Sequence, residues 1–233
     1  MLVAVAVCPC PPLLVPEVAA GAAPEMDAVR AACVDALGVL AAARPDRLVV
    51  IGPAEHGGHY PQGTPGSFRS FGVDLDVTLG PGATSAAELP ASLAVAAWLL
   101  ERTGWAEAPA EGVAVDMALT AARCAGLGAE IAGGSDRIAL LVMGDGSACR
   151  SLKAPGYLDE RAAPFDAEAA RALGTADLAV LAALDAGLAG ELQAAGRAPW
   201  QVLAAAAEGA GLEGTLLYDE APYGVGYLVA AWS

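Results

Sequence analysis

The sequence is poor in lysine, histidine and aromatic residues. Lys153 is the only lysine, there are two histidines, and aromatic side chains make up 5% of the 233 residues. Hydrophobic residues nevertheless make up 56% of the chain, so we expect a core built largely from Ala, Val and Leu. A chain of this length buries roughly 70% of the surface that its unfolded form exposes. We therefore expect one domain spanning residues 1–233.

Positive charge is also scarce. The 12 basic residues face 27 acidic ones that are scattered along the whole chain, and the formal net charge is −15. An acidic surface of this kind repels phosphate backbones and anionic lipids. This balance argues against nucleic acid and against a membrane surface as partners.

Long apolar runs and a disulfide framework are both missing. The first apolar run, LVAVAV, has six residues and no basic leader, which is too short for a signal sequence or a membrane span. The five cysteines, at positions 8, 10, 33, 124 and 149, are odd in number and widely spaced. A reducing compartment suits such a set better than secretion does, and we expect a cytoplasmic protein.

The glycine turn GDGSACR lacks the common nucleotide-binding motifs. It contains neither a G-x-x-x-x-G-K-[ST] loop nor a G-x-G-x-x-G turn, and the sequence shows no G-x-S-x-G elbow. Without them, neither nucleotide binding nor serine hydrolysis has support.

What the sequence does contain is an alternation of apolar strands and Ala-rich helices. Apolar runs predict buried strands at 2–7, 47–52 and 138–143, and helical periodicity predicts helices at 24–46, 88–103, 117–132 and within 165–210. FGVDLDVTLG alternates with period two, which indicates a half-exposed strand that is antiparallel or at an edge. GTLLYDEAPYGVGYLVAAW predicts two strands around a turn. The fold expected is α/β: a single-domain sandwich with a mixed central sheet flanked by helices, in which the three apolar strands are neighbours at the centre.

Polar residues follow four of the predicted strands, in CPCPPLL, GPAEHGGHYP, GDGSACRS and YDEAPYG. Open α/β sheets bind ligands in the loops beyond their strand ends. The pattern predicts that Cys10, His56 or His59, Arg150 and Glu220 converge around one cavity at one end of the sheet.

Each of these loops has a second interpretation. His56 and His59 flank two glycines and could turn to one metal ion, or could be solvated loop residues. Cys8 and Cys10 are closer together than the cysteines of a C-x2-C zinc knuckle, so they could equally be small buried hydrophobes. The glycine turn GDGSACR could present N–H groups to an anion or be an ordinary turn.

Three segments together resemble the subunit-B-like domain of class III extradiol ring-cleavage dioxygenases, in particular a divergent branch of short alanine-rich bacterial proteins. They are VCPCPPLLVPEVA, MGDGSACRSLKAPGYLDERAAPFDAEAARAL and APYGVGYLVAAW, and the resemblance spans nearly the whole chain. It implies a non-heme metal site in which Cys10 replaces the first metal-binding histidine. His56, with His59 as its substitute, would be the second ligand, and Glu220 or Asp219 the carboxylate.

The resemblance also implies a histidine at the end of the glycine turn that acts as acid and base. Here Cys149 or Arg150 stands at that point. Arginine stays protonated and cannot move protons at neutral pH, whereas Cys149 could titrate if a positive neighbour lowered its pKa.

The function expected is that of an extradiol-dioxygenase-like protein with an incomplete or altered metal site, which binds a small aromatic or anionic molecule. A site of Cys10, His56, His59 and Glu220 would suit Fe(II), zinc or copper, since thiolate favours softer metals, and a metal-free pocket is an equally physical outcome. An active ring-cleaving dioxygenase with a rearranged ligand set is one alternative. A non-catalytic subunit or interaction protein is another, and each is compatible with a homo-oligomer.

Overall fold

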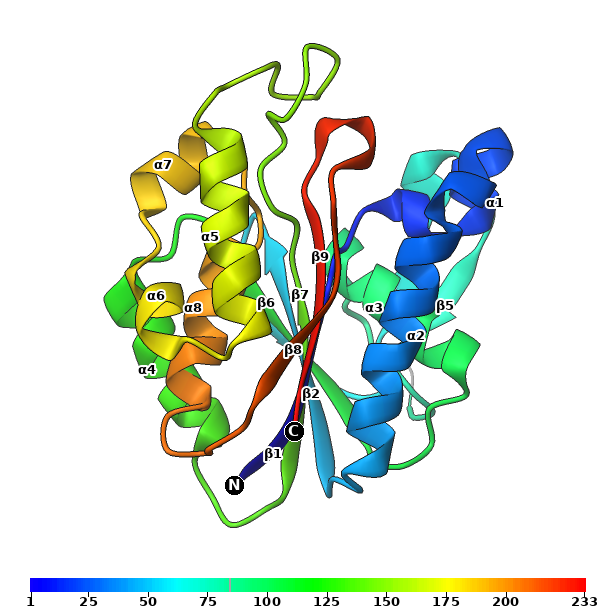
Figure 1. Ribbon diagram of the computed structural model, residues 1–233. Helices are drawn as coiled ribbons and strands as arrows, with labels where there is room; N and C mark the ends of the chain where they lie inside the picture. The colour runs from blue at the N-terminus through cyan, green and yellow to red at the C-terminus, as the bar shows by residue number, and fades with distance from the viewer. Residues whose placement is uncertain (84) are drawn as a thin grey trace.

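A seven-stranded sheet with helices on both faces forms the centre of the molecule (Figure 1). The computed structural model describes residues 1–83 and 85–233. The strand order is β3-β6-β2-β7-β1-β9-β8. The strands are β1 (Leu2–Cys8), β2 (Arg47–Ala54), β3 (Gly58–Tyr60), β6 (Ala110–Asp116), β7 (Ile138–Met143), β8 (Gly214–Glu220) and β9 (Tyr227–Trp232). The predicted α/β class, with a mixed sheet flanked by helices, is confirmed.

The three strands predicted to be neighbours are neighbours. β7 lies between β2 and β1 and runs parallel to both, and all of its residues are buried. A strand that helices cover on both faces has no side chain facing water, which explains why IALLVM shows no polar alternation.

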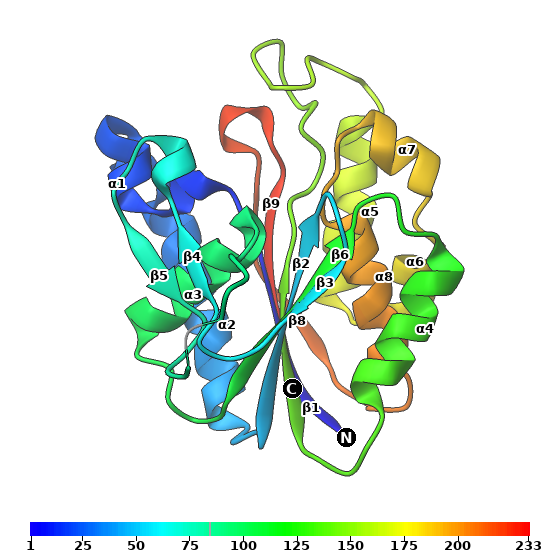
Figure 2. The same ribbon diagram turned by 180° about the vertical axis from the view of Figure 1, so that it is seen from behind.

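The helices divide into two groups, one on each face of the sheet, as the two opposite views show (Figures 1 and 2). One face carries α1 (Pro16–Ala19), α2 (Asp27–Ala42) and α3 (Ala91–Thr103). The other carries α4 (Ala121–Ala132), α5 (Ala162–Gly174), α6 (Leu178–Ala183), α7 (Ala186–Glu191) and α8 (Arg197–Ala206). Each face has its own apolar core, and the fully buried Trp200 and Trp232 belong to the second.

The alternating segment FGVDLDVTLG does not join the central sheet. Only Asp76–Thr78 forms a strand, β5, and it pairs antiparallel with β4 (Pro65–Ser67) in a separate two-stranded sheet. Arg69 ties this small sheet together through ion pairs with Asp74 at 2.9 Å and Asp76 at 2.5 Å. The central sheet is mixed because β3, β8 and β9 run antiparallel to their neighbours.

The helical region 165–210 is divided into separate helices, mainly by the residues that cap the helix ends. Gly174 is the last residue of α5, Gly196 is the N-cap of α8, and Gly187 lies inside α7. The side chain of Asp177 accepts the N–H of Val180 at 3.2 Å and starts α6, and Asp185 starts α7 in the same way. N-cap carboxylates satisfy N–H groups that a helix leaves unpaired at its start.

The remaining helices begin later than expected, and the first of them also ends earlier, at Ala42. The expected helix 24–46 begins only at Asp27, because Pro24 lies in the preceding 3-10 turn, Ala20–Met26. Other 3-10 turns are Pro12–Leu14, Arg69–Phe71 and Pro222–Gly224. Among the described residues, no helix has the length and apolar character needed to cross a membrane.

The topology brings the predicted loops to one end of the sheet. β1, β2, β6 and β7 are parallel, so their carboxyl ends lie together. β9 runs antiparallel to β1, and the β8–β9 hairpin therefore turns at the same end, which is the upper end in Figure 1.

Gly128 is the point at which α4 approaches α8 most tightly, and it offers a test of this packing. A Cβ at Gly128 would lie 2.8 Å from the Cβ of Ala205 and would also strike the carbonyl oxygen of Val202. We expect Gly128→Ala to lower the free energy of unfolding by about 1–3 kcal/mol, because the helices must separate. Urea denaturation measures the effect.

The matched control is Gly126→Ala, two residues away on the same helix. A Cβ at Gly126 would meet no atom within 4 Å, and alanine favours helix over glycine by about 0.5–1 kcal/mol. Equal stabilities of the two variants would contradict the close approach of α4 and α8.

Candidate functional site

The three segments that carry the family resemblance meet at the carboxyl end of the sheet. The N–H of Gly144 donates to the carbonyl oxygen of Cys8 at 2.9 Å, and the N–H of Gly146 donates to that of Gly226 at 2.7 Å. These bonds join the turn after β7 to the end of β1 on one side and to the β8–β9 hairpin on the other. Residues far apart in the sequence therefore form one surface.

Cys10 and Asp145 form the centre of this surface. The N–H of Cys10 donates to Oδ1 of Asp145 at 2.8 Å. Asp145 is partly buried, and its loss of hydration raises the pKa of the carboxyl group to about 7, against a smaller lowering effect of the Cys10 N–H. A carboxyl group that titrates near neutral pH can both donate and accept a proton.

The Cys10 thiol is buried, and desolvation, followed by the charge of Asp145, raises its pKa. Cys8 lies deeper in the same core, where the Cys33 thiol and burial raise the pKa of its own thiol. Both groups are therefore neutral thiols at neutral pH, and either would have to release its proton to bind a metal ion.

Tyr227 lies at the start of β9 in the same core as Cys10. It is buried, and desolvation first and the charges of Asp145 and Cys10 next raise the pKa of its phenol. Its hydroxyl group makes no hydrogen bond within the part of the chain that the structure describes. Tyr227 therefore adds a neutral hydroxyl group to the surroundings of Asp145.

Asp166, on α5, holds the glycine turn in place. Its side chain is 1% exposed and accepts three hydrogen bonds: from the N–H of Ser147 at 2.7 Å, from the Ser147 hydroxyl at 2.7 Å, and from the guanidinium of Arg150 at 2.9 Å. The charge of Arg150 is thus largely compensated inside the protein. Sequence reasoning did not select Asp166, and an acidic residue in an otherwise apolar register of α5 was the available signal.

Asp219 adds negative charge beside this ion pair. Burial raises the pKa of its carboxyl group, while Arg150 lowers it and Asp166 raises it. The carboxyl groups of Asp166 and Asp219 thus both lie near one guanidinium, that of Arg150. An anionic ligand would meet net negative charge here.

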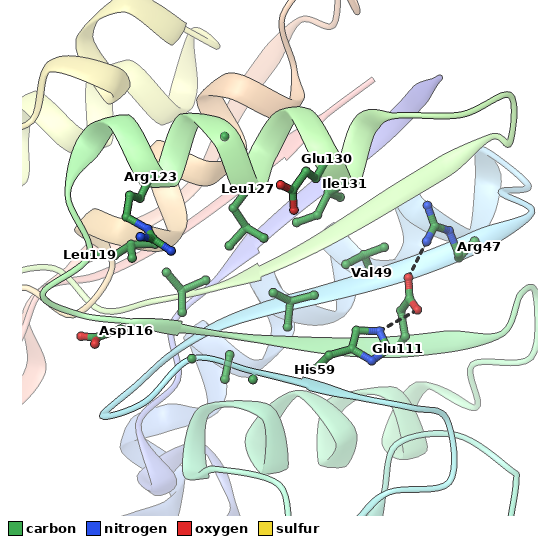
Figure 3. A pocket seen from close by; sticks show the side chains of 16 residues that line it. Arg47, Val49, His59, Glu111, Asp116, Leu119, Arg123, Leu127, Glu130 and Ile131 are labelled. Atoms are coloured by element: carbon green, nitrogen blue, oxygen red, sulfur yellow. Dashed lines mark hydrogen bonds and ion pairs between the residues drawn. The ribbon is translucent and has the colours of Figure 1, made fainter.

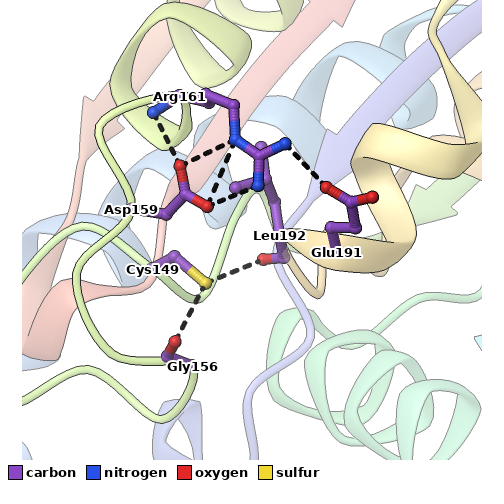
Figure 4. Close-up of polar contacts among 6 residues, drawn as sticks. All are labelled: Cys149, Gly156, Asp159, Arg161, Glu191 and Leu192. Carbon is purple, nitrogen blue, oxygen red and sulfur yellow. Dashed lines mark hydrogen bonds and ion pairs between the residues drawn. The ribbon is translucent and has the colours of Figure 1, made fainter.

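Cys149 is buried in the loop that follows the glycine turn (Figure 4). Its thiol lies 3.5 Å from the carbonyl oxygens of Gly156 and Leu192, to which it can donate its proton. Desolvation raises the pKa of the thiol, and Asp159 raises it further. The nearby Arg161 is engaged by Asp159 and by Glu191, the latter at 2.6 Å. Cys149 therefore stays protonated and does not meet the condition for an acid–base group.

The two histidines occupy different positions relative to Cys10. His56 is exposed on the turn between β2 and β3. His59 lies on β3, which runs back along β6, and its Nε2 is 3.0 Å from Oε2 of Glu111. β3 is four strands away from β1, and strands are about 4.8 Å apart, so His59 is on the order of 19 Å from the strand that carries Cys10.

Glu220 lies at the opposite edge of the sheet. It is exposed at the end of β8 and accepts the hydroxyl proton of Tyr218 at 3.2 Å. The structure does not bring Cys10, His59 and Glu220 to one point, because the sheet spreads them over both edges and the centre. Within residues 1–83 and 85–233, no group of three or more His, Cys, Asp or Glu side chains is arranged to hold a metal ion.

The fold defines a single-domain α/β protein with a seven-stranded mixed sheet. The whole chain is similar to the crystal structure of uncharacterized protein JW3007 from Escherichia coli K12, with a TM-score of 0.59 and 12% sequence identity over 99% of each chain. At this identity the similarity establishes the fold alone. The sequence matches no family model and no curated protein.

Asp145 makes stability depend on pH in a defined direction. The pKa of its carboxyl group is about 7 in the folded protein against 3.8 for an ordinary aspartate, so the folded state holds its proton more tightly. Stability from this group is present below about pH 4 and is lost as the pH rises to about 7. Asp145→Asn keeps an acceptor for the Cys10 N–H and removes this loss of stability at higher pH. We expect the variant to gain on the order of 2 kcal/mol over wild type at about pH 8, and much less at about pH 5.

Urea denaturation at both pH values measures this difference, and Asp35→Asn, at an exposed site on α2, is the control. A stability difference between wild type and Asp145→Asn that does not change with pH would show that the carboxyl group is already ionised in the fold.

Removing the Asp166 carboxylate tests the anchor of the glycine turn. Asp166→Ala leaves Arg150 and the N–H of Ser147 without their acceptor, and we expect a loss of about 3 kcal/mol in the free energy of unfolding. Glu168→Ala, at an exposed position on the same helix, should change it by less than about 0.5 kcal/mol. Similar melting temperatures for the two variants would contradict the anchoring role.

Proposed function

We propose that this is an extradiol-dioxygenase-like protein with an altered metal site, which binds a small hydroxylated aromatic molecule at the carboxyl ends of β1 and β7. The observation that carries the proposal is the Cys10–Asp145 pair, at the point where the three resembling segments meet. Asp145 would accept a proton or hydrogen bond from a ligand hydroxyl group, and the Tyr227 hydroxyl would donate to the ligand.

The charge of the surroundings supports a neutral or cationic ligand over an anionic one. Arg150 already shares its charge with Asp166, and Asp145 and Asp219 add acidic groups. A carboxylate-bearing aromatic acid would approach like charges, which weakens binding, whereas an amine would approach opposite ones. We therefore favour a catechol-like molecule that is neutral or carries an amine.

The residues present do not fit the metal set that the family resemblance implies. Cys10 is a neutral thiol, His59 lies on the far edge strand, and Glu220 is exposed two strands from β1. The active-dioxygenase alternative requires a rearrangement that brings His56 to Cys10, and the non-catalytic alternative requires no ligand at the Cys10–Asp145 pair.

Calorimetric titration with dopamine, catechol and protocatechuate, which are cationic, neutral and anionic, tests the binding site. We expect affinity to fall in that order, and Asp145→Asn to weaken dopamine binding by about tenfold through the loss of a charge-assisted hydrogen bond. Asp35→Asn is the control and should bind as wild type does. Tightest binding of protocatechuate, or unchanged dopamine binding in Asp145→Asn, would refute the assignment.

Ring cleavage is expected to be negligible when the protein is supplied with Fe(II), oxygen and a catechol. An acid–base group contributes about 10²–10⁴ in rate, and neither Arg150 nor the buried Cys149 provides one at the expected position. Oxygen uptake and the absorbance of a yellow ring-opened product are the measurements. A product that forms with wild type and disappears in a His56→Ala, His59→Ala double variant would instead establish the active-enzyme alternative.

A further inference from the structure

A groove of about 900 Å³ lies between α4 and the strands β2, β6 and β3 (Figure 3). It is separate from the Cys10–Asp145 pair, because its lining strands lie on the other side of β7 from β1. The groove exists because α4 packs against α8 rather than against the strands beneath it. Gly128 permits that close helix contact, so α4 stays above the edge of the sheet.

The walls of the groove are apolar. Val49 on β2 and Val113 on β6 line the groove. Leu127 and Ile131 extend from α4 toward the strand that carries Val49, as Figure 3 shows. Val113 and Leu127 are only partly buried. Apolar surface left open to water in a concave site is typical of a place where a ligand or partner binds.

The polar groups at one end of the groove are already engaged. Glu111 accepts from Arg47 at 2.5 Å and from His59 at 3.0 Å, which joins the three side chains in one network (Figure 3). The Nε of Arg47 is buried and has no acceptor within the described residues. The carboxylate of Glu111 is therefore compensated, whereas Glu130, which also lines the groove, forms no ion pair among the described residues.

The opposite end of the groove carries one cationic and one anionic side chain, those of Arg123 and Asp116. Arg123 lines it and forms no ion pair with any residue that the structure describes, and α4 begins there with no acidic residue in its first turn and no side-chain cap from Thr120. Asp116 also lines this end, but its Oδ1 accepts the N–H of Ala118 at 2.7 Å. Glu130 lies seven residues along α4 from Arg123, which is about 10 Å along the helix axis. Arg123 and the free N–H groups of the helix start favour an anion at this end.

We propose that the groove binds an elongated amphipathic carboxylate, such as a medium-chain aliphatic acid, with its carboxylate at Arg123 and its chain along Val113, Leu127 and Ile131. From Arg123 to Ile131 the helix advances eight residues, or about 12 Å, which gives room for a chain of medium length. The apolar walls supply the affinity through burial of the chain, and Arg123 fixes its direction through paired N–H donors.

Calorimetric titration of the full chain with octanoate and with octanol tests this site. We expect octanoate to bind saturably. Arg123→Gln should weaken the binding of octanoate by about tenfold and leave the binding of octanol unchanged, because only octanoate carries the charge that Arg123 recognises. Leu127→Glu should abolish the binding of both octanoate and octanol, because it places a carboxylate among the apolar walls. Thermal melting checks that this variant folds. Arg102→Gln, on α3, is the control and should bind as wild type does.

The proposal is overturned if octanoate shows no saturable binding at about 1 mM, or if Arg123→Gln binds it as wild type does. It is also overturned if Arg123→Gln weakens octanol equally. A change from dimer to monomer in Leu127→Glu, measured by gel filtration, would show that a second copy of the chain covers the groove instead. These results are independent of the Cys10–Asp145 pair, since the probes and the variants differ.

Discussion

The buried carboxylate of Asp166 joins helix α5 to the turn after β7 and, through that turn, to the β8–β9 hairpin. A Cβ on Gly146 would lie 2.8 Å from its Oδ1, and a Cβ on Gly226 would lie 2.5 Å from its Oδ2. Both positions are therefore restricted to glycine by one side chain. The arrangement of Cys10, Asp145 and Tyr227 depends on this anchor, because the same turn carries Asp145 and pairs with the residue that precedes Tyr227. Burial of a charged group is favourable only when hydrogen bonds and an ion pair compensate its charge. Ser147 and Arg150 supply these interactions to Asp166.

The centre of the fold could be predicted because its signals are local. Runs such as RLVVIG and IALLVM are apolar without alternation, and only a strand covered on both faces requires that. The gathering of the loops at one end followed from the same parallel arrangement. His59 could not be placed, since the pairing of β3 with β6 depends on a contact between residues more than 50 positions apart. The pKa of Asp145 and the anchor at Asp166 also arise from long-range burial, which no spacing in the sequence reveals.

In the proposed function, Cys10 stands where the family resemblance implies a metal-binding histidine, and this changes more than the identity of one ligand. A buried thiol beside a carboxyl group is hard to ionise, because burial and the charge of Asp145 both raise the pKa of the Cys10 thiol. Neutral imidazole binds a metal without losing a proton, whereas a thiol must lose one first. In that proposal the position therefore carries a neutral thiol beside a carboxyl group that titrates near neutral pH. The chemistry proposed for the site is hydrogen bonding with hydroxyl groups rather than metal coordination.

Helix α4 is attached to the molecule through α8. The width of the groove therefore does not depend on the residues that line it. The distance between α4 and β6 is set on the far side of the helix, at Gly128, where no ligand atom would touch. A larger residue on α8 opposite Gly128 would tilt α4 while every wall residue stayed the same. Related chains could thus admit thicker or thinner molecules through changes in a helix–helix contact alone, and a comparison restricted to the lining residues would miss the difference.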